Sequence, residues 1–260
     1  MTETPAYVIL GRGRWAKKIQ PILTAEGRTV TTVEETRQRS LETTPSYLSR
    51  LSKSMKASRA QIAWLCVLPG PHVFQMMQAA LGTGLHVVAE KPWYGSGADT
   101  ERLQGLARAK RRLIAVDFEY LVHQEVRKWK ESVYPGTGMR FGGHFFLSRP
   151  DHTGIPAFDN LGSHLMAIRE FAAPAAEVCE LQCGYERPGE RTVWLERSKK
   201  RVASIDLLKG SERIIQDFIR KVEAALDGGA FPFGLDLALR VEHELNAYTR
   251  NVARNLFTPS

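Results

Sequence analysis

Residues 6–27 read AYVILGRGRWAKKIQPILTAEG, and this stretch contains three patterns in succession. The apolar run over 6–10 predicts a short buried strand. Gly11 and Gly13 follow it directly and indicate a tight turn. Apolar residues then recur at the spacing of a helix as far as Gly27, a residue type that commonly ends helices. The stretch therefore predicts a strand, a glycine turn and a helix.

The glycine turn has the form G-x-G-x-x-A, from Gly11 through Gly13 to Ala16. In such turns the first glycine permits the bend, the second lets the backbone approach a pyrophosphate, and the small third residue allows close helix packing. The start of the helix would supply backbone N–H groups to the phosphates. Glycines are common in turns of any kind, so the position of the motif in the first strand-turn-helix carries the interpretation. We interpret it as a dinucleotide-binding turn.

Strands and helices continue to alternate over roughly the first 120 residues. Apolar runs predict strands over 28–35, 60–70, 85–90 and 113–120, and helical spacing predicts helices over 71–84 and 99–112. Nearly continuous apolar runs are typical of strands that are buried on both faces of a parallel sheet. The sequence predicts an α/β Rossmann fold, a doubly wound parallel sheet, as an NAD(P)-binding domain over residues 1–117.

The pattern changes after this domain. Alternating residues predict strands over 139–149, 191–198 and 201–210, without long helices between the last two, and helices are expected over 159–173, 211–229 and 235–255. Such alternation is typical of an antiparallel sheet with one covered face. We expect residues 118–260 to form a small α+β domain for substrate binding and dimerisation, with an open, mainly antiparallel sheet. The C-terminal helices are expected to pack back on the Rossmann domain.

Composition excludes several classes of protein. The formal charge is +8, but the basic residues are scattered and form no recognised nucleic-acid module. No apolar run reaches the ~18 residues of a membrane span, and no basic segment precedes the N-terminal apolar run, so we expect a cytoplasmic protein with no membrane or nucleic-acid partner. The three cysteines, Cys66, Cys179 and Cys183, lack other ligands nearby in the sequence, which predicts free thiols and no metal.

Two further segments follow predicted strands and should lie at the same edge of the sheet as the glycine turn. They are 68–72, LPGPH, and 90–92, EKP. Ligands of open parallel sheets bind outside the carboxyl ends of the strands. Lys91 is then expected to present a cation to a nicotinamide site. The alternative is that Glu-Lys-Pro merely turns a strand end into solvent.

The end of the second strand bears on the choice of cofactor. A carboxylate there usually holds the ribose 2′-hydroxyl of NAD, whereas an arginine accommodates the 2′-phosphate of NADP. Glu34 lies near this position, but Arg37, Arg39 and Arg12 compete with it. The arginines favour NADP(H) over NAD(H), and a loop that is simply solvated is the alternative.

Several segments together resemble the Gfo/Idh/MocA group of nicotinamide-dependent oxidoreductases. Residues 7–19 and 62–93 resemble its Rossmann domain, which ends in a Glu-Lys-Pro signature; residues 114–120 resemble the strand that follows. Residues 155–171 are similar to its D-x-G-x-H helix, and 214–248 to its C-terminal helices. The resemblance covers nearly the whole chain and implies hydride transfer between a nicotinamide and a small substrate.

The resemblance also implies roles for individual residues. Lys91 is expected to donate a proton or to act as an electrostatic clamp, and His164 is the second proton donor, with a buried structural histidine as the alternative. Glu119 and Tyr120 are further catalytic candidates, each with a packing role as the alternative. The residues expected to bind the cofactor are Gly11, Arg12, Gly13, Arg14, Trp15, Ala16, Glu34, Arg37, Leu68, Pro69, His72, Glu90, Lys91 and Pro92.

Two departures from the family pattern guide the expected function. Asn160 stands where the family has aspartate, with Asp159 one residue away, and the second domain is shorter than usual. Loss of the carboxylate favours reduction over oxidation of an alcohol. The expected reaction is reduction of C=N or C=O, with a thiazolinyl imine reductase acting on a carrier-tethered siderophore intermediate as the specific hypothesis. A sugar dehydrogenase and a noncatalytic NAD(P)-binding regulator are the alternatives; the expected partners are a small-molecule substrate, an acidic carrier domain and a second subunit in a homodimer.

Overall fold

A computed structural model describes residues 4–132, 138–151, 153–226, 228 and 231–257. The chain forms two compact units. The first contains residues 1–117 and 215–239, and the second contains residues 118–214 and 240–260. The C-terminal part of the chain thus contributes to both units.

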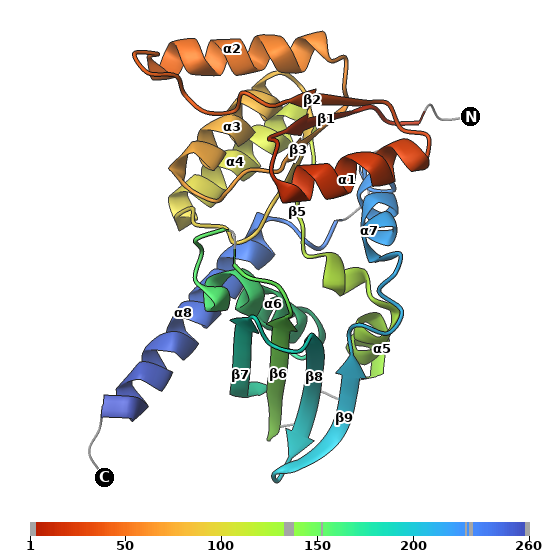
Figure 1. The fold of residues 1–260 in the computed structure, drawn as a ribbon, viewed down its shortest axis with the longest axis vertical. Coiled ribbons are helices and arrows are strands. Elements are labelled where there is room, and N and C mark those ends of the chain that lie inside the picture. Colours follow the sequence, from red (N-terminus) through yellow and green to blue (C-terminus); the bar gives the residue numbers. More distant parts are fainter. Residues whose placement is uncertain (1–3, 133–137, 152, 227, 229–230, 258–260) are drawn as a thin grey trace. The chain divides into compact units, whose positions relative to one another are not determined.

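The first unit is built on a parallel sheet of five strands in the order β2-β1-β3-β4-β5 (Figure 1). Its strands are β1 (Tyr7–Leu10), β2 (Val30–Val33), β3 (Ile62–Leu65), β4 (His86–Ala89) and β5 (Ile114–Val116). Its helices are α1 (Arg14–Ala25), α2 (Thr44–Ala57), α3 (Pro71–Gly82), α4 (Gly97–Lys110) and α7 (Ile214–Glu223). The predicted Rossmann fold is confirmed.

Burial explains why the central strands are so apolar. Every residue of β1, β3 and β4 is buried. Helices α2, α3 and α4 cover one face of the sheet, and α1 with α7 covers the other (Figure 1). Right-handed crossovers require this division, because the chain moves in one direction from β1 to β2 and then in the opposite direction from β2 to β3, β4 and β5. The order reverses at β1, so the turn after β1 lies at the switch point of the sheet.

The C-terminal segment of the first unit completes the edge of the sheet. The N–H of Val116 in β5 donates to the carbonyl oxygen of Phe233 at 2.7 Å. In α7, the Phe218 ring lies 6.0 Å from Trp64 of β3 and 6.1 Å from Phe231. The segment at Phe233 thus provides a hydrogen-bond partner for the edge strand β5, and the aromatic rings extend the core of the unit.

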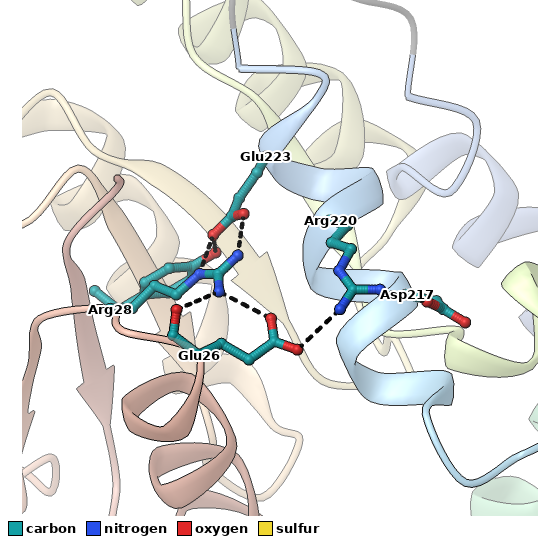
Figure 2. Close-up of polar contacts among 6 residues, drawn as sticks. Glu26, Arg28, Asp217, Arg220 and Glu223 are labelled. Atoms are coloured by element: carbon teal, nitrogen blue, oxygen red, sulfur yellow. Dashed lines mark hydrogen bonds and ion pairs between the residues drawn. The ribbon is translucent and has the colours of Figure 1, made fainter. Parts of the chain in front are cut away.

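A polar network also joins α7 to the turn after α1 (Figure 2). Arg28 donates through Nε and Nη2 to both carboxylate oxygens of Glu223, at 3.1 and 2.8 Å, and through Nη1 to Glu26 at 2.8 Å. The hydroxyl of Tyr7 donates to the same Glu223 at 2.8 Å, and burial, followed by the Glu223 charge, raises the pKa of this tyrosine. Arg220 of α7 adds a contact with Glu26 at 3.2 Å. The network fixes a helix that is distant in sequence to the first strand.

The second unit contains a mixed sheet in the order β7-β6-β8-β9. Its strands are β6 (Met139–Leu147), β7 (Glu177–Tyr185), β8 (Glu190–Arg197) and β9 (Lys200–Asp206), and its helical segments are η1 (Glu119–Val122), α5 (Gln124–Ser132), η2 (Phe158–Gly162), α6 (Ser163–Ala172) and the C-terminal part of α8 (Leu235–Phe257). Strands β6 and β7 are parallel, and the other two pairings are antiparallel.

Two glycines of β6 allow close packing on both faces of this sheet. A Cβ at Gly143 would lie 2.8 Å from the Leu165 side chain of α6, so the helix rests directly on the strand there. On the other face, a Cβ at Gly142 would lie 2.3 Å from the indole of Trp194. Side chains at either position would displace these neighbours.

Several local predictions need correction. The strand expected over 113–120 ends at Val116, and residues 119–122 form a 3₁₀ helix. Helix α2 and strand β7 were not predicted, and β7 makes the sheet of the second unit mixed. The first turns of the helix expected over 159–173 form a π-helix.

All three cysteines are free thiols, as expected. No helix in the described part of the chain is long and apolar enough to cross a membrane. Among the same residues, no group of three or more His, Cys, Asp or Glu side chains is placed to hold a metal ion.

Candidate active site

Gly11 forms the turn between β1 and α1 and has a φ of +123°, which L-residues with a side chain rarely adopt. A Cβ there would lie 2.4 Å from the carbonyl oxygen of Cys66, at the end of β3. The N–H of Gly11 donates to Val33 of β2 at 3.0 Å. The protein's own packing therefore requires glycine at this position.

Gly13 is different, because the protein's own packing leaves its side-chain position open. The nearest atom to a Cβ there would be the Cys66 carbonyl oxygen, at 4.0 Å. Gly13 caps α1 without a side-chain hydrogen bond, the first turn of α1 contains no acidic residue, and Ala16 is buried beneath it. Open space beside the N–H groups of a helix start fits the pyrophosphate of a dinucleotide. The exposed Arg12 and Arg14 flank this position and add positive charge.

The loop after β2 is held in place by α2. Arg50 donates to the carbonyl oxygens of Glu35 and Arg37, at 2.9 and 3.0 Å. It also pairs with Glu42 at 2.9 Å, and this hydrogen bond lowers the pKa of Glu42 to about 2. Glu34 and Arg37, the two candidates for contact with the ribose, are both exposed on this loop.

The segment after β3 leads directly into α3, which begins at Pro71. Leu68 is half-exposed, and the imidazole of His72 lies 3.1 Å from where a Cβ of Gly70 would be. Burial lowers the pKa of His72, with a smaller contribution from the charge of Arg37. A neutral imidazole therefore follows the third strand at neutral pH.

Glu90 and Lys91 directly follow β4. The indole Nε1 of the buried Trp64 donates to the Glu90 carboxylate at 3.0 Å. Lys91 is half-buried, the Lys91–Pro92 peptide is cis, and Pro92 is buried. The hydrogen bond fixes Glu90, the residue before Lys91, to the adjacent strand. Glu90 therefore has a structural role in addition to the cofactor-binding role that the sequence predicts.

Asp117 is a residue of this region that the sequence analysis did not select. It is buried at the end of β5 and accepts a hydrogen bond at 3.1 Å from the indole of Trp15 in α1. Burial, followed by the charges of Glu90 and Asp117, raises the pKa of the Cys66 thiol well above its usual value. The ends of β3, β4 and β5 thus bring these groups together beside the glycine turn, and Cys66 stays a thiol.

In the second unit, Glu119 and His164 lie together. The His164 Nδ1 atom is 3.7 Å from a Glu119 carboxylate oxygen, and both residues are buried. His164 is stacked on Phe145 of β6, with ring centroids 5.1 Å apart and an interplanar angle of 11°. The Glu119 carboxylate can orient the imidazole ring. An imidazole is a group that can exchange a proton with a substrate.

Tyr120 lies against the same imidazole, edge to face, with ring centroids 5.1 Å apart. Its hydroxyl oxygen accepts a hydrogen bond from Nη1 of Arg191 in β8. Burial raises the pKa of Tyr120, as does Glu119, whereas Arg191 opposes them. Tyr120 therefore keeps its proton at neutral pH. Arg191 was missed by the sequence analysis.

Asn160, at the position of the family aspartate, donates through Nδ2 to the Tyr185 hydroxyl at 2.7 Å. Gly162 lies against α8, since a Cβ there would be 3.3 Å from Leu245. Asp159 and Glu242 of α8 approach each other; burial, followed by the Asp159 charge, raises the pKa of Glu242 to about 7. Sequence analysis gave no indication of Glu242.

His123 has a structural role. Its Nε2 atom lies 2.7 Å from the carbonyl oxygen of Lys209, and its Nδ1 accepts from the Glu125 N–H at 3.3 Å. Both ring nitrogens are used to tie the start of α5 to the segment after β9. The structure thus brings Glu119, Tyr120 and His164 together in the second unit. In the first unit it brings together the glycine turn and Glu90.

Comparison with known proteins relates the first unit to a family. The sequence model of the Gfo/Idh/MocA oxidoreductase family, described by its NAD-binding Rossmann fold, matches residues 6–118. Residues 6–118 are therefore similar to the NAD-binding Rossmann domain of that family, and the match covers less than half of the chain. No curated protein matches the sequence at a significant level.

Solved structures extend the likeness beyond the Rossmann domain. GenD2 from gentamicin A biosynthesis, in complex with NAD, is 17% identical with a TM-score of 0.74, over 97% of this chain and 95% of that chain. UDP-N-acetylglucosamine 3-dehydrogenase from Acidithiobacillus ferrooxidans is 12% identical with a TM-score of 0.73, over 94% and 96% of the two chains. A 3-ketoreductase from Actinomadura kijaniata, in complex with TDP-benzene and NADP, is 16% identical with a TM-score of 0.65, over 92% and 95%. At these identities the likeness establishes the fold of both units.

Proposed function

We propose that this protein reduces a C=O or C=N group of a small biosynthetic intermediate with NAD(P)H. The observation that carries the proposal is the buried set of Glu119, Tyr120 and His164 in the second unit. It offers an imidazole and a phenol to a substrate, in a chain whose first unit has the geometry of a dinucleotide site.

The first unit is assigned to the cofactor. The turn at Gly11 and Gly13 and the first N–H groups of α1 would hold its pyrophosphate, with Arg12 and Arg14 adding charge. When bound, the cofactor supplies the hydride. Arg37, exposed on the loop after β2, supports the proposed preference for NADP(H) over NAD(H).

Reduction leaves an oxyanion or an amine that requires a proton. The His164 imidazole, with Glu119 beside Nδ1, is assigned as the proton donor, and the Tyr120 hydroxyl donates a hydrogen bond to the same atom of the substrate. Lys91 is assigned as a second donor or an electrostatic clamp. Asn160 cannot act as a base, since its neutral amide does not take up a proton near neutral pH, and this favours reduction over oxidation.

A sugar-type ketone is the leading substrate class. Proteins of similar fold include a UDP-N-acetylglucosamine 3-dehydrogenase and a 3-ketoreductase solved with TDP-benzene. A cyclic imine on a carrier-tethered siderophore intermediate is the second candidate. It is supported by the charge of +8, which would attract an acidic carrier domain. We also propose that the protein acts as a homodimer.

Stopped-flow fluorescence tests the function directly. The protein is loaded with NADPH or NADH and mixed with a panel of 3-keto sugar nucleotides and a thiazoline thioester, while the loss of reduced nicotinamide is followed. We expect oxidation of NADPH by a substrate of one class. Tight cofactor binding without oxidation by either class would support a noncatalytic regulator instead.

The Lys91→Met variant tests the assignment of Lys91 as a second donor or electrostatic clamp in the same assay. We expect turnover to fall by about 10²–10⁴-fold while cofactor affinity is kept, because general acid catalysis contributes on this order. Lys110→Met, an exposed lysine of α4, is the matched control. Unchanged turnover in the Lys91 variant would remove Lys91 from the mechanism.

A further inference from the structure

Arg191 projects from β8 into the aromatic part of the second unit. Its guanidinium carbon lies 5.8 Å from the Tyr120 ring centroid and 5.2 Å from the Phe145 ring centroid. Its Nη1 atom donates to the Tyr120 hydroxyl oxygen. The cation is thus placed beside the same tyrosine and phenylalanine that contact His164.

In the part of the chain that the structure describes, this arginine has no carboxylate partner. Its interactions are the hydrogen bond to Tyr120 and the two ring contacts, and its covered Nε atom has no hydrogen-bond partner among the described residues. The nearby Glu119 carboxylate contacts His164 instead. Two other partly buried arginines of the second unit, Arg169 and Arg140, are paired with glutamate.

An unpaired guanidinium that is partly removed from water reduces stability, since its lost hydration is not replaced. A neutral residue could hold the Tyr120 ring by packing alone. An arginine, in contrast, presents several N–H donors in one plane and matches a carboxylate or phosphate with two parallel hydrogen bonds. One of these donors is used by Tyr120, and the half-buried side chain retains others.

We propose that Arg191 binds an anionic group, a carboxylate or phosphate, on the substrate, and so determines specificity. This inference rests on the proposed function and narrows its substrate class to acidic intermediates, such as sugar acids. The arginine would orient the substrate next to His164 and Tyr120. Because a guanidinium can only donate, Tyr120 must accept from it, and its own O–H remains directed to another acceptor.

Calorimetric titration of the full chain with D-glucuronate and with uncharged D-glucuronamide tests the inference without turnover. The two probes differ only in the carboxylate. We expect the wild-type protein to bind glucuronate about ten-fold or more tightly than the amide, as expected for a charge-assisted pair. Arg191→Gln should abolish this preference, and Arg191→Lys should keep only part of it.

Arg197→Gln is the matched control, since Arg197 is exposed on the same strand and should leave the preference unchanged. Equal binding of the two probes by the wild type, including no binding of either, would overturn the proposal, as would a preference that survives in Arg191→Gln. Circular dichroism checks that each variant is folded. Because cofactor titration and NAD(P)H oxidation are measured separately, failure of the proposed reaction is distinguishable from failure of anion recognition.

Discussion

Trp64 of β3 donates a hydrogen bond from its indole Nε1 to the carboxylate of Glu90 at 3.0 Å, and Glu90 immediately precedes Lys91. The indole is fully buried, so its direction is fixed by the core. The position of the proposed catalytic lysine is therefore set by a residue on the neighbouring strand.

Trp64→Phe should reduce turnover about ten-fold and stability by about 1–3 kcal/mol, because the Glu90 carboxylate loses a donor and the segment before Lys91 loosens. Trp93→Phe is a matched control: its indole donates to Thr100 at 3.0 Å within the same unit, and its loss should lower stability alone. Urea denaturation and steady-state rates separate the two effects. Equal turnover in both variants would contradict a positioning role for Trp64.

The two glycines of the first turn should respond differently to alanine. Gly11→Ala should destabilise the fold, because its Cβ would meet the Cys66 carbonyl oxygen at 2.4 Å and its φ is +123°. Gly13→Ala should fold normally, since its Cβ has no atom closer than 4.0 Å, but it should weaken NADPH binding about ten-fold or more by occupying the pyrophosphate position. Thermal denaturation and fluorescence titration measure the two quantities. Normal cofactor affinity in the Gly13 variant would place the pyrophosphate elsewhere.

The ion pairs of Arg28 should contribute more to stability than those on the surface (Figure 2). Arg28→Ala leaves the Glu223 carboxylate without its cation in a region where the side chains of Arg28 and Glu223 are only 13% and 15% exposed. We expect a loss of about 2–4 kcal/mol. Arg39→Ala, which removes a pair whose side chains are 60% and 70% exposed, should cost much less. Similar losses in the two variants, measured by urea denaturation, would contradict the assignment.

The features of this protein that could be predicted from sequence are those carried by short-range patterns. The glycine turn and the apolar strands 7–10, 62–65 and 86–89 each occupy a few consecutive residues, and their alternation with helices is sufficient for a parallel sheet. Helix α2 was missed although Tyr47, Leu51 and Met55 recur at its buried face. Its many serine and threonine residues lower helix propensity and suggest a loop, but tertiary packing overrides them.

The rest of the candidate site depends on contacts between distant residues. Arg191 lies in an ordinary strand pattern, and its partner Tyr120 is 71 residues away. Strand β7 has few buried residues, and it pairs in parallel with β6. A parallel pair has no hairpin turn between its strands, so the sequence contains no turn signal for β7. Such residues acquire their roles only through the fold of the second unit.

Glu242 is a further case of this kind and makes stability depend on pH. Burial, followed by the negative charge of Asp159, raises its pKa from 4.5 to about 7. Between these values the folded protein holds a proton that the unfolded chain releases. The contribution of Glu242 to the stability of the fold is therefore fully present below pH 4.5 and is lost as the pH rises through about 7.

Glu242→Gln should remove this loss, because an amide resembles the protonated carboxyl and does not titrate. We expect the wild type to lose about 1 kcal/mol more than the variant between pH 5 and pH 8, a value reduced for the partial exposure of the side chain. Urea denaturation at several pH values provides the measurement. Glu101→Gln, an exposed glutamate of α4, is the control and should follow the wild type at every pH. A Glu242 variant with the same pH dependence as the wild type would contradict a raised pKa of this carboxyl in the folded protein.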